Sequence, residues 1–118
     1  MNTADFVLQV IALYRRLAGN HVRPRRTDRE LAAAWHHRGM TLASIEGAML
    51  LALARRTVRP PEAPLLPPIR SLHYFIPLLE EVTARPLADH YLAYLRAQLA
   101  GVLADPDPGA RPGNDVSR

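Results

Sequence analysis

Apolar residues recur at three- and four-residue steps along most of the sequence, which is the spacing of an amphipathic α-helix. The clearest stripes are Phe6, Val10, Leu13 and Leu17 near the start, and Leu92, Leu95, Leu99 and Val102 near the end. Hydrophobic residues make up 48% of the chain, which is enough to pack a globular core. We therefore expect an all-α fold, a compact bundle of about five helices.

Residues that satisfy free backbone groups mark the expected helix ends. Thr3 is expected to cap the first helix and Gly19 to end it. The sequence Thr-Asp-Arg-Glu at residues 27–30 has the pattern of a capping box that opens a second helix. Gly39 then separates the second helix from the third, so residues 31–57 have the outline of a helix-turn-helix-like hairpin.

Prolines divide the second half of the chain. Residues 59–68 contain five prolines, which remove amide donors and prevent a helix, so a stiff surface connector is expected there. The segments on either side are too short to bury separate cores, and residues 1–104 are expected to form a single domain. Pro77 either kinks a helix over residues 69–83 or lies in the first turns of a helix that starts later. Residues 105–118 are expected to form a disordered tail.

Several kinds of site are disfavoured by the sequence. There is no Cys, which excludes a disulfide, a thiolate zinc site and a cysteine nucleophile. The five His residues show no HxxH or HxxxH spacing, and the sequence has no GxSxG motif or glycine-rich phosphate loop. We therefore expect no metal, no cofactor and no catalytic residue, and interpret the chain as a protein that is not an enzyme.

No stretch of the sequence is apolar for long enough to span a membrane. The longest, at residues 48–54, is far below the roughly 20 residues that a span requires. Residues 1–14 lack the basic start of a signal peptide. A cytoplasmic location without membrane contact is therefore expected.

All 15 basic residues are Arg, a bias that is typical of GC-rich genomes, so their position is more informative than their number. Residues 15–29 hold six arginines and only one acid, Asp28. The six are Arg15, Arg16, Arg23, Arg25, Arg26 and Arg29. Guanidinium groups bind phosphate oxygens in pairs, and a basic connector between two helices can follow a nucleic-acid backbone. The alternative interpretation is a solvated loop in an Arg-rich protein.

A smaller basic set brackets the proline-rich connector: Arg55, Arg56, Arg59 and Arg70. Arg55 and Arg56 also stand at an expected helix C-terminus, where the helix dipole favours cations whatever their function. This set gains functional weight only if folding places it beside residues 15–29.

The third helix is a weak candidate for reading DNA bases. A recognition helix needs polar and basic side chains on its exposed face. Here that face would show Thr41, Leu42, Ala43, Glu46 and Gly47. The hairpin is therefore interpreted as part of the core. The aromatic residues Tyr74, Phe75, Tyr91 and Tyr94 are also interpreted as core, with a role in an interface as the alternative.

A Gly-turn helix pair at residues 31–57 is followed by Tyr74, Leu78 and Val82 at four-residue steps. Over residues 27–83 this order resembles the helical DNA-remodelling domain of DnaD-type replication initiation proteins and phage replisome organisers, where a Trp takes the place of Val82. The resemblance implies DNA binding, with Tyr74 close to the DNA. The segment that begins at Ile69 is also similar to stretches of uncharacterised mobile-element proteins from GC-rich bacteria.

The leading hypothesis is a non-catalytic bacterial accessory protein, associated with replication or mobile elements, that binds nucleic acid with little sequence preference, DNA rather than RNA. The arginines of residues 15–29 are its expected phosphate contacts, with Arg55, Arg56 and Tyr74 as additions. The alternative is a protein-interaction module, a small subunit or adaptor, that docks through an apolar helix face. Residues 42–54 suggest such a face because they include few polar residues. A homodimer is left open.

Overall fold

The computed structural model describes residues 1–19 and 21–103, with side chains described up to residue 100. Its helices are α1 (Thr3–Ala18), α2 (Arg26–His37), α3 (Leu42–Thr57), α4 (Ile76–Ala84) and α5 (Asp89–Leu103), and a 3-10 turn, η1 (Leu72–Phe75), precedes α4. The described residues include no strand, which confirms the all-α prediction. The tail predicted at residues 105–118 lies outside the described residues.

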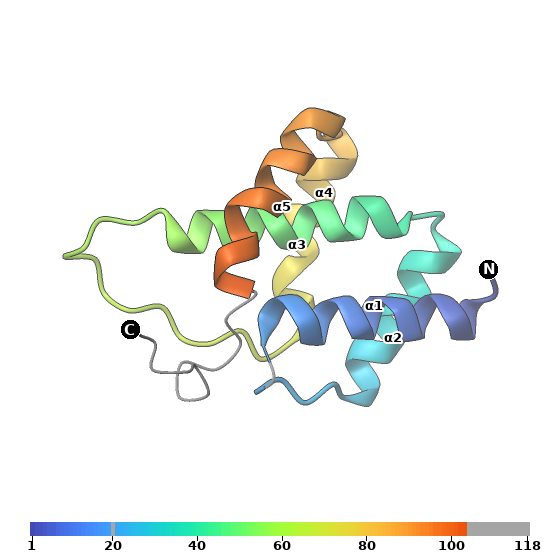
Figure 1. Ribbon diagram of the computed structural model, residues 1–118. Helices are drawn as coiled ribbons and strands as arrows, with labels where there is room; N and C mark the ends of the chain where they lie inside the picture. Colours follow the sequence, from blue (N-terminus) through green and yellow to red (C-terminus); the bar gives the residue numbers. More distant parts are fainter. Residues whose placement is uncertain (20, 104–118) are drawn as a thin grey trace.

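Helix α3 occupies the centre of the fold. It packs against α1, α4 and α5, whereas α2 packs mainly against α1 and touches η1 (Figure 1). Its buried residues are Ile45, Gly47, Ala48, Met49, Leu50, Leu51 and Ala52. A Cβ atom on Gly47 would lie 3.3 Å from a methyl group of Leu87, so glycine permits the close approach of the segment that leads into α5. The apolar character of residues 42–54 is thus explained by burial within the chain's own core.

The start of α2 differs from the prediction. The helix begins at Arg26, with Arg25 at the N-cap position, so Thr27 lies inside the helix and does not cap it. The backbone N–H of Arg25 donates to Oδ2 of Asp28 at 2.9 Å, so Asp28 is the acceptor in the position that the capping-box pattern predicts for Glu30. A guanidinium has no acceptor atom, so the Arg25 side chain cannot cap the helix itself. At α1, likewise, Asn2 replaces Thr3 as the cap and accepts from the Asp5 amide at 2.8 Å.

Gly39 ends α2 as predicted. It adopts a φ of 82°, in the left-handed region that glycine tolerates. Its N–H donates to the His36 carbonyl and that of Met40 to the Trp35 carbonyl, each at 3.0 Å. This is the bonding pattern of a Schellman turn, which satisfies carbonyls left free at the helix end.

Pro77 is accommodated by a late helix start. Residues Leu72–Phe75 form the 3-10 turn, and α4 begins at Ile76, so Pro77 lies in the first turn of the helix. An N–H at that position would have no partner within the helix, and its absence therefore costs nothing. Of the two arrangements expected for this segment, the kinked helix is excluded.

Tyr14 is fully buried in α1, and its hydroxyl has no hydrogen-bond partner among the described residues. Its ring packs edge-on against Phe75, with 6.3 Å between the ring centres. Burial, with a smaller contribution from the negative charge of Asp28, raises the pKa of Tyr14 from 10.0 to about 12. The protonated form is therefore the one that the fold accommodates.

Replacing Tyr14 by Phe should remove a loss of stability at alkaline pH. Because the folded pKa lies above the unfolded one, the contribution of Tyr14 is fully present below pH 10 and is lost as pH rises to about 12. The wild type should lose about 1.4 kcal/mol per pH unit over that range, and Tyr14→Phe should not. Urea unfolding at pH values between about 9 and 12 measures the difference. Parallel curves for the two proteins would show that Tyr14 ionises as easily in the folded state as in the unfolded state.

Candidate nucleic-acid interface

Asp28, the one acid among residues 15–29, is buried at the start of α2 with 1% of its surface exposed. Its Oδ1 accepts the backbone N–H of Leu72 at 2.9 Å and the hydroxyl of Ser71 at 3.2 Å. Its Oδ2 accepts the N–H of Arg25 at 2.9 Å, and Nδ1 of His73 lies 3.7 Å from Oδ1. The carboxylate therefore joins the connector between α1 and α2 to the segment that begins η1.

Whereas the Asp28 side chain is buried, the arginines around it are exposed to solvent. All six predicted contacts are exposed: Arg15, Arg16, Arg23, Arg25, Arg26 and Arg29. Several interact locally: Arg26 pairs with Glu30 at 3.0 Å, and Arg29 donates to the Pro24 carbonyl at 3.3 Å. Exposed pairs of this kind contribute about 0–1 kcal/mol and are readily exchanged for another anion. The segment thus presents its positive charges to solvent and turns its acid inward.

Folding fastens the segment that carries Arg70 to the connector between α1 and α2 and to Asp28. The ring N–H of His21 donates to the Ile69 carbonyl at 3.0 Å, and Ser71 and Leu72 both donate to Asp28. Residues 69–72 are therefore fastened to the connector on both sides of Arg70. Ile69 and Leu72 are buried while Arg70 is exposed, so its guanidinium lies on the outer side of this segment. The sequence grouped Arg70 with the arginines near the prolines, and no local pattern indicates its place beside the connector.

We name these seven residues the arginine surface. It consists of Arg15, Arg16, Arg23, Arg25, Arg26, Arg29 and Arg70.

Arg55 and Arg56 lie elsewhere, at the end of α3. Figure 1 shows this end of α3 projecting to the left, away from the start of α2 at the bottom. Arg55 forms a two-bond pair with Glu81 of α4, at 2.9 and 2.6 Å. This hydrogen bonding raises the pKa of Arg55 and lowers the pKa of Glu81 from their ordinary values. Arg55 thus links α3 to α4.

Arg56 binds the end of the proline-rich connector to α3. It donates to the Pro67 carbonyl at 2.7 Å and to the Tyr74 hydroxyl at 3.2 Å, and its guanidinium carbon lies 5.5 Å from the centre of the Tyr74 ring. These contacts hold Pro67 and Tyr74, which stand on either side of Arg70 in the sequence, against the end of α3. A cation over an aromatic face adds to the stability of such a contact.

Replacing Arg56 by Ala should loosen residues 59–68. A glutamyl endopeptidase should then cut after the exposed Glu62 about five-fold faster, since the net loss of stabilisation is about 1 kcal/mol. Arg38→Ala, which removes an exposed arginine from the other end of the molecule, should leave the rate unchanged. Equal cleavage of Arg56→Ala and wild type would show that Arg56 does not hold the connector.

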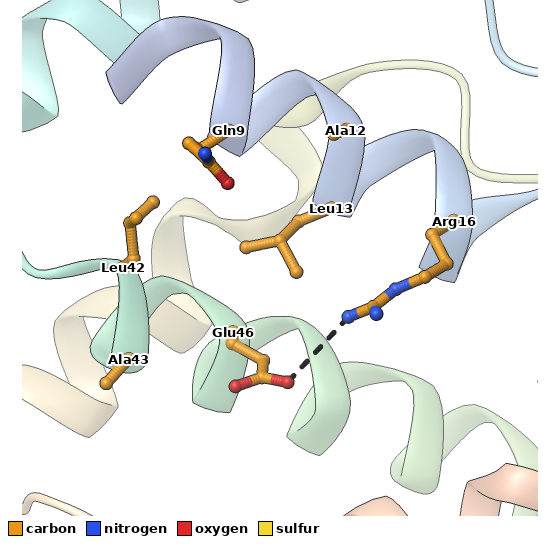
Figure 2. Close-up of a pocket in the computed structure, with 7 residues that line it drawn as sticks. All are labelled: Gln9, Ala12, Leu13, Arg16, Leu42, Ala43 and Glu46. Carbon is orange, nitrogen blue, oxygen red and sulfur yellow. Dashed lines mark ion pairs between the residues drawn. The ribbon is translucent and has the colours of Figure 1, made fainter. Parts of the chain in front are cut away.

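A groove of about 460 Å³ runs between α1 and α3 (Figure 2). Leu13 and Leu42 point into it, and Gln9, Ala12 and Ala43 complete its walls. At one end Glu46 takes a two-bond contact from Arg96 of α5 and a longer one, at 3.9 Å, from Arg16. The groove thus borders the arginine surface at Arg16.

The tyrosines differ from the sequence-based interpretation. Phe75 is buried as predicted, but Tyr74, Tyr91 and Tyr94 are exposed. Tyr91 and Tyr94 stack one turn apart on α5, with 6.0 Å between ring centres, and Tyr94 is 55% exposed. Tyrosine has a polar tip, so helical spacing beside leucines does not force it into a core.

No group of three or more His, Asp or Glu side chains in residues 1–19 and 21–103 could hold a metal ion. Within the part of the chain that the structure describes, no helix has the length and apolarity needed to cross a membrane.

Comparison of the chain with protein-family models, curated proteins and solved structures found no match. A functional interpretation therefore depends on the chain's own residues and geometry.

Proposed function

We propose that this protein binds nucleic acid through the phosphate backbone, as a non-catalytic accessory protein with little sequence preference, and that DNA is the ligand. The arrangement around Asp28 carries the proposal: the single acid of residues 15–29 is buried, the arginines around it are exposed, and the segment that carries the exposed Arg70 is hydrogen-bonded to Asp28 and His21. Several guanidinium groups on adjoining segments match the repeated charges of a phosphate backbone. An association with replication or mobile elements remains part of the proposal through the resemblance noted above.

The position of Arg25 and Arg26 at the start of α2 costs stability, which favours a role for these two residues outside the fold. Arg25 is the N-cap of α2 and Arg26 its first residue, next to the positive end of the helix dipole. Anionic side chains are the ones that stabilise a helix at this end. An arrangement that is unfavourable for the isolated helix becomes favourable when a phosphate group binds there.

Base reading is not part of the proposal. The helix that would act as a recognition helix is α3, which is the most buried helix of the fold. Glu46, on its more open side, is occupied by Arg96 and Arg16. Contacts to phosphate alone position a protein on a duplex without selecting a sequence.

The salt dependence of binding tests the proposal. Anisotropy of a fluorescein-labelled random duplex and of a random single strand is measured at about 50 and 200 mM NaCl. For about four phosphate contacts, affinity for the duplex should fall roughly 100-fold between these conditions. Failure to bind either probe at the lower salt concentration would contradict the proposal.

Arg25→Ser should have opposite effects on stability and binding. The serine hydroxyl can accept the N–H of Asp28, which in the wild type donates to the Arg25 carbonyl at 3.0 Å, and this completes a capping box with the existing bond from the residue 25 N–H to Asp28. Unfolding should become about 1 kcal/mol less favourable, which raises Tm by several degrees. Affinity for the duplex at low salt should fall several-fold because one phosphate contact is lost. Calorimetry and anisotropy measure the two effects, and a joint loss of both would contradict this explanation.

The second candidate function is a protein-interaction module, including a homodimer. It is favoured by the exposed stacked pair Tyr91 and Tyr94, since tyrosine is enriched in interfaces. The apolar residues of α3 no longer support it because they are buried in the core. If the pair mediates self-association, sedimentation equilibrium should show a dimer that Tyr91→Ala and Tyr94→Ala together convert to a monomer. If the wild type is a monomer even at high concentration, a homodimer is excluded.

A further inference from the structure

The two oxygens of Asp28 serve two different segments. Oδ2 accepts the N–H of Arg25, at the end of the connector that carries the arginines. Oδ1 accepts from Ser71 and Leu72, which follow Arg70 directly. The carboxylate is thus a short bridge between the two segments that supply the arginine surface. Because it is buried, water does not compete for these bonds.

We propose that Asp28 is a positioning residue for nucleic acid: it holds the connector arginines and Arg70 in one fixed arrangement without touching the ligand. This inference rests on the proposed function. A surface whose segments are already fixed binds more tightly than one that must be ordered on binding. The negative charge of Asp28, by itself, has the opposite effect because it opposes the approach of phosphate. Geometry and charge therefore predict opposite results when the charge is removed.

Asp28→Asn separates these two effects at the level of atoms. The amide oxygen of asparagine can still accept from Leu72 and Ser71, where Oδ1 is now. The amide NH2 then replaces Oδ2 opposite the Arg25 N–H, and two donors cannot bond to each other. The variant loses the bridge to the connector and one negative charge, while most of the side-chain volume stays.

The experiment compares full-length proteins on a fluorescein-labelled random duplex at about 50 mM NaCl, at a temperature where both are folded by circular dichroism. Asp28→Asn should bind about five-fold more weakly than wild type. Asp5→Asn, which removes an exposed acid of α1, should bind as wild type or slightly more tightly. Binding by Asp28→Asn that equals or exceeds wild type would overturn the inference and leave the proposed function in place. Absence of binding by the wild type would overturn both.

Ser71→Ala provides a second test that leaves the charge of Asp28 unchanged. It removes one of the three donors, and Ser71 is only half-buried, so the fold should persist. Affinity should fall about two-fold, with faster amide exchange at Arg25 and Leu72 as the sign of a looser bridge. Faster exchange with unchanged affinity would contradict a positioning role, because the bridge would then serve the fold alone.

Discussion

Replacing Arg25, Arg29 and Arg70 together by Gln should weaken binding to a random duplex about 100-fold at about 50 mM NaCl. These residues come from two segments that the bonds to Asp28 and His21 hold side by side. Glutamine keeps most of the side-chain length and removes the charge, so the loss reports the electrostatic contribution. Loss of one phosphate contact should weaken binding about five-fold at this salt concentration, so the loss of three should weaken it by about 100-fold.

The matched control removes three charges elsewhere. Arg38, Arg59 and Arg85 lie just after the ends of α2, α3 and α4, away from the connector between α1 and α2. Their joint replacement by Gln changes net charge by the same amount and should reduce affinity less than about five-fold, through the long-range field alone. Equal losses in the two triple variants would show that net charge, and no particular surface, governs binding.

Asp28→Ala should lower the free energy of unfolding by about 3 kcal/mol. The buried N–H of Leu72 loses its acceptor, and so do the Ser71 hydroxyl and the Arg25 amide. Leaving a buried donor without a partner costs about 1–3 kcal/mol, and hydrogen bonds to a charged group are among the stronger ones. For a domain of this size the loss is a large part of the total stability.

Urea unfolding followed by circular dichroism measures this loss. Asp5→Ala is the control: that side chain is exposed in the first turn of α1, where its charge favours the helix, so its replacement should lower the free energy of unfolding by less than about 1 kcal/mol. A loss below about 1 kcal/mol for Asp28→Ala would show that water or a rearranged turn satisfies the three donors.

The helices and several of their ends could be predicted from the sequence because these features are local. Apolar residues at helical spacing place α1, α2, α3 and α5, and Gly39 marks the end of α2 through its left-handed φ. The start of α2 was placed too late because Thr27 is a better intrinsic cap than Arg25. The bond from Arg25 to Asp28, together with the bonds of Asp28 to residues 71 and 72, determines where the helix begins.

The candidate site could be predicted only in part. Charge density identified residues 15–29, and the structure leaves all six of their arginines exposed. The burial of Asp28 and the place of Arg70 depend on hydrogen bonds between residues far apart in the sequence, which leave no local pattern. Arg55, Arg56 and Tyr74 remain predicted contacts from the sequence, but their bonds to Glu81 and Pro67 give them structural partners.

The slope of log affinity against log salt concentration tests the central claim most directly. Wild type and the Arg25, Arg29 and Arg70 triple variant are titrated with the same random duplex between about 50 and 200 mM NaCl. If each of the three arginines contacts a phosphate group, the slope should be smaller in magnitude by about 2.7 in the variant, since each contact contributes about 0.9. The control triple at Arg38, Arg59 and Arg85 should keep the wild-type slope. Identical slopes for wild type and the Arg25, Arg29 and Arg70 variant would contradict phosphate binding by this surface.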